Sequence, residues 1–127
     1  MTNLSQLIAV LIAMESSDND RAVSPDGDCA GCLQLKREYV DDVNRILGRK
    51  KFWYAERYDR TKSIQMFRIE IGHYLTAERL GHEMTWRDVC AFHNQGWTGM
   101  HDPAKQGDVQ KYLQRCVEEA TKKGIEL

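Results

Sequence analysis

Residues 4–16 read LSQLIAVLIAMES, and this stretch decides the fold class. Its aliphatic residues at positions 4, 7, 8, 11 and 12 recur at helical spacing, and most of the positions between them are also apolar. A helix that is apolar nearly all round is buried in a protein core. The polar block at 15–20 follows, so we expect the helix to end there.

Helical periodicity recurs in four later segments that glycine or proline separates. These segments are 39–47 before Gly48, 64–75 ending near Gly81, 85 to about 93 opening on a capping box, and 109–120 before Gly124. Residues 18–32 predict a loop or short hairpin, and 49–58 predict a loop. The expected fold is mainly α, a single helical domain over residues 1–127 with at most a small β-hairpin after the first helix.

Composition and charge exclude several classes of protein. A chain of 127 residues supports one domain with one hydrophobic core. Lys and Arg number 18 against 19 Asp and Glu, a net charge of −1, so the basic excess of a nucleic-acid-binding protein is missing. The longest apolar run, 7–14, falls well short of the roughly 20 residues that cross a bilayer, so no membrane span is expected.

Two further features of the sequence bear on the cellular compartment in which the protein is expected. No positive charge precedes the apolar run, and no small-residue cleavage site follows it, so we expect no signal peptide. The protein is then expected to stay in the cytoplasm unless another agent exports it. Four cysteines are too few for a disulfide scaffold in a chain of this length, and we expect reduced thiols.

Glu15 is the residue with the most informative position. It follows the apolar run at the C-terminal end of the first predicted helix, where burial and the negative end of the helix dipole both disfavour a carboxylate. We therefore expect a raised pKa. A carboxyl group that holds its proton near neutral pH suits the general acid of glycosidic cleavage. Alternatively, Glu15 only marks where the helix reaches solvent.

Four short segments occur in a recognisable order: Glu15-Ser16, AVS at 22–24, GCLQL at 31–35 and AFHNQG at 91–96. Together they resemble the soluble lytic transglycosylase family of the lysozyme superfamily. Its signature is a Glu-Ser pair ending a helix, Ala-Val-Ser, Gly-Leu-Met-Gln and a distal Ala-Tyr-Asn-Ala-Gly. VDDVNRILG at 40–48, YDR at 58–60 and MF at 66–67 are similar to phage-associated members. The resemblance covers residues 7–116.

The chain departs from that signature in four places. Cys32-Leu33 stands where Leu-Met is usual, His93 stands where Tyr, or Trp in some relatives, is usual, and Trp97 follows Gly96 where Pro is common. The stretch from Gly27 to Gly31 is also one residue longer than in the commonest version. These departures concern substrate preference more than the fold or the role of Glu15.

The resemblance implies an enzyme that cleaves the β-1,4 bond between N-acetylmuramic acid and N-acetylglucosamine in peptidoglycan. It implies that Ser24 and Gln34 line the floor of a saccharide groove, where hydroxyl and amide groups bind the glycan. Asn94 would bind glycan or satisfy backbone groups at a helix end. His93 and Tyr112 would stack on sugar rings, although Tyr112 also lies in the apolar stripe of the last helix, where core packing is the more common role.

The mechanism follows one of two routes. A hydrolase of the muramidase type needs a second carboxylate, for which Asp26, Asp28 and Asp59 are candidates, with Asp28 foremost. All three are otherwise ordinary loop residues. The resemblance implies a route with Glu15 alone, which protonates the leaving oxygen and then removes the proton of the muramyl 6-hydroxyl to give a 1,6-anhydro end.

A rival constellation points to zinc. Cys29, Cys32, Cys90 and His93 have the paired spacings of a Cys3His site. Against this, position 32 is apolar in the family, and a lone buried cysteine behaves as a small hydrophobic residue. We expect no metal and no cofactor.

A second class of function stays open: a weak or inactive glycan-binding or structural module of a phage particle or secretion machine. For the enzyme, the expected partner is the peptidoglycan glycan strand and the expected state is a monomer. Because no signal peptide is expected, a phage endolysin released by a holin and a particle-borne enzyme both fit.

Overall fold

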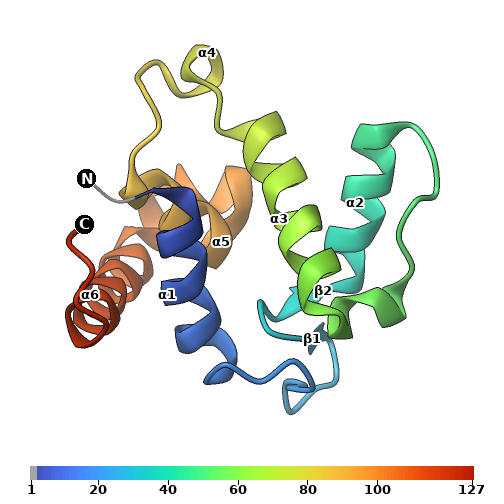
Figure 1. Ribbon diagram of the computed structural model, residues 1–127. Helices are drawn as coiled ribbons and strands as arrows, with labels where there is room; N and C mark the ends of the chain where they lie inside the picture. Colours follow the sequence, from blue (N-terminus) through green and yellow to red (C-terminus); the bar gives the residue numbers. More distant parts are fainter. Residues whose placement is uncertain (1–2) are drawn as a thin grey trace. The chain divides into compact units, whose positions relative to one another are not determined.

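The structure, a computed structural model, describes residues 3–127 and is mainly α, with one small two-stranded sheet (Figure 1). The elements in chain order are α1 (Leu4–Ser16), β1 (Cys29–Ala30), β2 (Leu35–Lys36), α2 (Arg37–Leu47), the 3-10 helix η1 (Tyr54–Tyr58), α3 (Arg60–Tyr74), α4 (Ala77–Leu80), α5 (Trp86–Met100), the 3-10 helix η2 (Pro103–Lys105) and α6 (Gln106–Lys122). The predicted fold class is confirmed, including the hairpin after the first helix.

The described chain divides into two compact units. The first unit holds residues 3–14 and 74–127, and the second holds residues 15–73. The single domain expected over residues 1–127 stays a prediction. Residues 1–2, which open the segment predicted not to be a signal peptide, lie outside the described residues.

In the first unit, α1 begins where its sequence provides a cap. The Asn3 side chain accepts a hydrogen bond from the Gln6 N–H at 2.8 Å, and the Gln6 side chain accepts one from the Asn3 N–H at 3.2 Å. This reciprocal pair satisfies backbone donors that the first turn leaves unpaired. The predicted burial of α1 is confirmed for five of its 13 residues, Leu7, Ile8, Val10, Leu11 and Ile12, whereas Ala9 in the same apolar run is exposed.

Helices α5 and α6 pack against each other in the same unit (Figure 1). The capping box predicted at the start of α5 is present: Thr85 N–H donates to Asp88 at 2.8 Å, and Asp88 N–H donates back to Thr85 at 3.4 Å. The predicted break at Gly96 is confirmed, because that residue is not helical (φ 72°, ψ 177°), but a second helical stretch that the sequence did not predict follows it and carries α5 on to Met100. The glycine breaks the helical conformation at one residue, and the helix resumes immediately after it.

In the second unit, α2 ends as predicted, with Gly48 in the left-handed conformation at φ 72°. Strands β1 and β2 form an antiparallel pair in which Ala30 lies opposite Leu35. The prediction of a loop over 49–58 is wrong for its last five residues, which form η1. A 3-10 helix of five residues is too short to produce a hydrophobic period, so the sequence carried no signal for it.

No helix within residues 3–127 is both long enough and apolar enough to cross a membrane.

Candidate active site

Glu15 lies in the last turn of α1 and is half-buried. The helix ends one residue later, and the chain turns sharply through Ser17 (φ 52°) and Asp18 (φ 66°), both in the left-handed region. A residue other than glycine in that region costs roughly 1–2 kcal/mol, so two in succession require external support.

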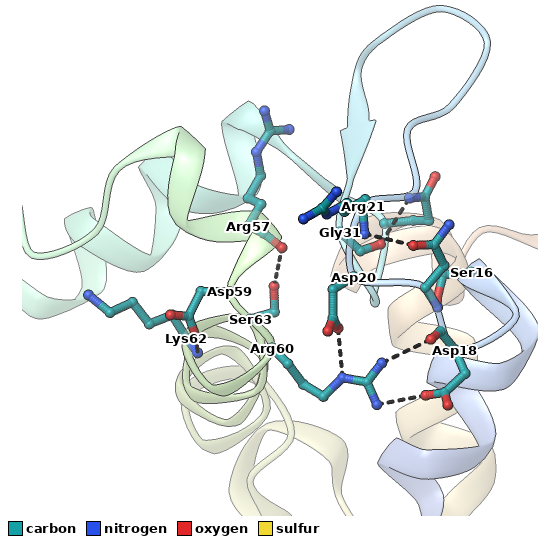
Figure 2. Close-up of polar contacts among 12 residues, drawn as sticks. Ser16, Asp18, Asp20, Arg21, Gly31, Arg57, Asp59, Arg60, Lys62 and Ser63 are labelled. Carbon is teal, nitrogen blue, oxygen red and sulfur yellow. Dashed lines mark hydrogen bonds and ion pairs between the residues drawn. The ribbon is translucent and has the colours of Figure 1, made fainter.

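Arg60, the first residue of α3, supplies that support (Figure 2). Its Nε contacts Asp20 Oδ1 at 2.6 Å and its Nη1 contacts Asp18 Oδ1 at 2.6 Å. Its Nη2 also donates to the main-chain oxygen of Asp18 at 3.1 Å. The hydrogen bonds to Asp20 and Asp18 raise the pKa of Arg60 above its ordinary value. Three of the guanidinium's donors therefore hold the turn that follows Glu15 against the start of α3.

Gln34 lies in the turn that joins β1 to β2 and has φ 53°. Its Nε2 donates to the main-chain oxygens of Ala22 at 3.0 Å and Gly31 at 2.9 Å. Both hydrogens of the amide nitrogen are used within the protein. A saccharide in the predicted groove can therefore form a hydrogen bond with the Gln34 side chain only by donating to its oxygen.

Ser24 organises the loop before β1. Its Oγ donates to Asp26 Oδ1 at 2.6 Å and accepts from the Cys29 N–H at 2.9 Å. The bond from Ser24, followed by one from the Asp28 N–H, lowers the pKa of Asp26. The Ser24 hydroxyl also forms a hydrogen bond with the Cys29 thiol, so its polar capacity is largely used within the loop. Asp28, the foremost candidate for a second carboxylate, is half-buried in this loop.

Arg57 ties the hairpin to η1, a role that the sequence analysis missed. Its side chain is 4% exposed. Its Nε donates to the Tyr54 main-chain oxygen at 2.8 Å, and its Nη1 donates to those of Asp28 and Leu35, both at 3.0 Å. A buried guanidinium satisfied by carbonyls is invisible in a sequence, because the hairpin partners lie 29 and 22 residues away.

Three of the predicted glycan-binding residues lie in the first unit. His93 is half-buried and Asn94 is exposed, both on α5. The Asn94 side-chain oxygen accepts from Gln95 Nε2 at 2.8 Å. Tyr112 is 5% exposed on the buried face of α6, so its burial supports the packing role that the apolar stripe predicted.

The predicted site residues thus form two groups. Glu15, Ser24, Asp28 and Gln34 belong to the second unit, and His93, Asn94 and Tyr112 belong to the first. The structure places each group within its own unit, and the groove that joins them stays a prediction.

The cysteines of the rival zinc site are divided in the same way. Cys29 and Cys32 lie in the second unit, whereas Cys90 and His93 lie in the first. Across residues 3–127, no three His, Cys, Asp or Glu side chains are grouped to hold a metal ion. A hydrogen bond with the Cys116 thiol, and then burial, raise the pKa of Cys90 far above its usual value.

Comparisons with protein-family models, with curated proteins and with solved structures gave no match to this chain.

Proposed function

We propose that the chain is a peptidoglycan-cleaving enzyme of the lytic transglycosylase type, acting on the β-1,4 bond between N-acetylmuramic acid and N-acetylglucosamine. One observation carries the proposal: Glu15 is half-buried at the end of a buried helix, and the turn directly after it is held by Arg60. A general acid needs a fixed position relative to the oxygen that it protonates. The resemblance of the four ordered segments supplies the substrate.

In the proposed reaction Glu15 acts twice. It first gives its proton to the glycosidic oxygen as the bond from that oxygen to the muramyl C1 breaks. As a carboxylate it then removes the proton of the muramyl 6-hydroxyl, whose oxygen forms a new bond to C1. The proton returns to Glu15, no water is consumed, and the product carries a 1,6-anhydro ring.

The loop aspartates support a route with a single carboxyl. Asp26 Oδ1 accepts from the Ser24 hydroxyl at 2.6 Å and from the Asp28 N–H at 3.0 Å. Asp59 Oδ1 accepts from the Lys62 N–H at 3.0 Å, at the start of α3. Two of the three candidates are therefore engaged in local turns, and a hydrolytic route would depend on Asp28.

A binding or structural module is the second candidate. The amide nitrogen of Gln34 and the donor hydrogen of Ser24 are used inside the hairpin region, which favours the structural role because these donors are not left for a glycan. In either role the proposed partner is the bacterial cell wall, reached as a phage particle component or through a holin, and the proposed state is a monomer.

The deciding experiment is mass spectrometry of the muropeptides released from purified cell walls. We expect 1,6-anhydromuramyl ends, about 20 mass units lighter than hydrolysed ends after reduction. Hydrolysed ends would contradict the transglycosylase route. An Asp28→Ala variant would then test whether Asp28 is the second carboxylate of a hydrolase. No release of muropeptides between about pH 4 and 8 would contradict the enzyme and favour the binding module.

A further inference from the structure

A second concave site lies in the second unit, between the outer face of α2 and the segment 50–54. It is a pocket of about 430 Å³, within the range of roughly 300–1,000 Å³ that small-molecule sites occupy. Its lining consists of Asp41, Asn44 and Arg45 on one side and Lys50, Phe52, Trp53 and Tyr54 on the other. None of them belongs to the predicted site around Glu15.

Asn44 holds the backbone of this pocket in place. Its Oδ1 accepts from the N–H groups of Lys51 and Phe52, both at 3.0 Å, and its Nδ2 donates to the Phe52 main-chain oxygen at 2.9 Å. The Phe52 side chain is 2% exposed and anchors the segment in the core. The segment that lines this side of the pocket is thus ordered before any ligand binds, which reduces the entropy lost on binding.

Two aromatic rings, those of Trp53 and Tyr54, line this side of the pocket. Trp53 is 54% exposed and Tyr54 is 43% exposed. The Tyr54 hydroxyl donates to Asp41 Oδ1 at 2.8 Å, and the Arg37 guanidinium lies 5.8 Å from the Tyr54 ring centroid. Tyr54 is therefore held in one orientation. Trp53, the more exposed of the two rings, offers an apolar face to a flat partner such as the C–H face of a sugar.

The charges of the pocket select the kind of ligand. The Lys50 ammonium lies 5.6 Å from the Trp53 ring centroid, and the Arg45 side chain is 61% exposed beside its partner Asp42. Asp41 is the one carboxylate among the lining residues, and Arg45 pairs with Asp42 beside the pocket, so Lys50 supplies most of the positive charge that can meet an anion. Lys51 and Arg49 add positive charge next to the pocket in the sequence. A sugar that carries a carboxylate complements this pattern better than a neutral sugar does.

We propose that this pocket binds an acidic amino sugar, the N-acetylmuramyl unit with its peptide carboxylate, separately from the bond that Glu15 cleaves. The sugar stacks on Trp53, and the carboxylate faces Lys50, which lies beside that ring. The identity of the sugar rests on the proposed function, whereas the preference for a carboxylate rests on the lining residues.

The test is an NMR titration of the full-length chain with N-acetylmuramyl-L-alanyl-D-isoglutamine. This probe has no bond to N-acetylglucosamine, so its binding is independent of catalysis. We expect the backbone amide shifts to concentrate at 41–45 and 50–54, and the affinity to fall as salt is added. Triacetylchitotriose, a neutral saccharide, should bind this site about threefold to tenfold more weakly.

Matched variants locate the ligand. Trp53→Ala should weaken binding about threefold to tenfold, whereas Trp53→Phe keeps a flat ring and most of the affinity. Lys50→Gln should weaken binding of the acidic probe, whereas Lys51→Gln, the neighbouring lysine outside the pocket lining, should have a smaller effect.

Four outcomes would overturn the proposal. These are shifts that lie elsewhere, equal affinity for the neutral saccharide, unchanged binding by Trp53→Ala, and binding to anionic phosphatidylglycerol vesicles with none to the muramyl probe. A failure of the proposed function gives a different result. A Glu15→Gln variant that still cleaves bacterial cell walls would contradict the catalytic assignment, but it would leave the NMR titration of the pocket unaffected.

Discussion

Gly31 lies so close to the main-chain oxygen of Arg57 that a β-carbon on Gly31 would collide with it. Gly31 also has φ 82°, and its N–H donates to the Ala22 oxygen at 2.8 Å. The same Arg57 oxygen accepts from the buried Ser63 hydroxyl at 2.7 Å. The close approach of Gly31 to Arg57 joins the hairpin that carries Gln34 to η1. The hydrogen bond from Ser63 joins η1 in turn to the first turn of α3.

We therefore expect Gly31→Ala to destabilise the protein severely, and Gly27→Ala to serve as its control. Both glycines have positive φ, but a β-carbon on Gly27 meets nothing within 4 Å. Gly27→Ala should cost only the roughly 1–2 kcal/mol of left-handed strain, whereas Gly31→Ala adds a collision with backbone and should exceed about 4 kcal/mol. Urea denaturation measures both. Equal midpoints for the two variants would show that the close approach has no energetic role.

Glu15→Gln should abolish wall cleavage and leave the fold intact. The amide keeps the shape of the side chain but cannot deliver a proton, and general acid catalysis accounts for a factor of about 10² to 10⁴ in rate. Turbidity of a cell-wall suspension measures the rate, and thermal denaturation checks the fold. Glu78→Gln on α4, an exposed glutamate, is the control and should keep full activity. If Glu15→Gln keeps half of the wild-type rate, Glu15 is not the acid.

Arg60→Lys should slow cleavage through the position of Glu15. Lysine keeps the charge but lacks the planar fork that reaches Asp20 and two atoms of Asp18. We expect kcat to fall about tenfold with little change in KM, because the substrate contacts are unaltered. The loss of stability should stay within about 1 kcal/mol per ion pair, since Arg60 is 37% exposed and Asp18 is 71% exposed.

Arg79→Lys, at an exposed arginine on α4, is the matched control for Arg60→Lys. It should leave kcat and KM unchanged. A rise in KM alone for Arg60→Lys would show that Arg60 contacts substrate instead of positioning Glu15.

Glu70 should make the folded state less stable as the pH rises. It is 2% exposed on α3, and burial, followed by a hydrogen bond with Asp42, raises its pKa from 4.5 to about 9. Its Oε2 has no hydrogen-bond partner within the described residues. Between these two pKa values the folded chain holds a proton that the unfolded chain has lost. The free energy of unfolding therefore falls with increasing pH, by up to about 1.4 kcal/mol per pH unit from this group.

Glu70→Gln removes this proton linkage, so its free energy of unfolding should decline less between about pH 5 and 9 than that of the wild type. Urea denaturation across that pH range gives the two slopes. Parallel curves would mean that Glu70 titrates normally in the folded state.

The helices and their ends were largely predictable from the sequence, because the interactions that define them are local. The start of α5 depends on Thr85 and Asp88, three residues apart, and the end of α2 depends on the left-handed freedom of Gly48. The apolar run of α1 predicted its burial. The position of Glu15 in the last turn of that helix followed from the same pattern, because it depends only on the helix ending where the polar block begins.

The tertiary structure alone decided what surrounds that end of the helix. Arg60 reaches Asp18 across 42 residues, and Arg57 reaches Asp28 across 29. The left-handed Gln34 is held by Ala22, 12 residues away. No local pattern in the sequence specifies such pairs, because each pair forms only where the folded backbone brings two distant segments together. The sequence by itself thus determined the helices and the place of Glu15 at the end of one. The folded chain determined which arginine holds the turn beside it, since ion pairs and close backbone approaches form only after distant segments have packed.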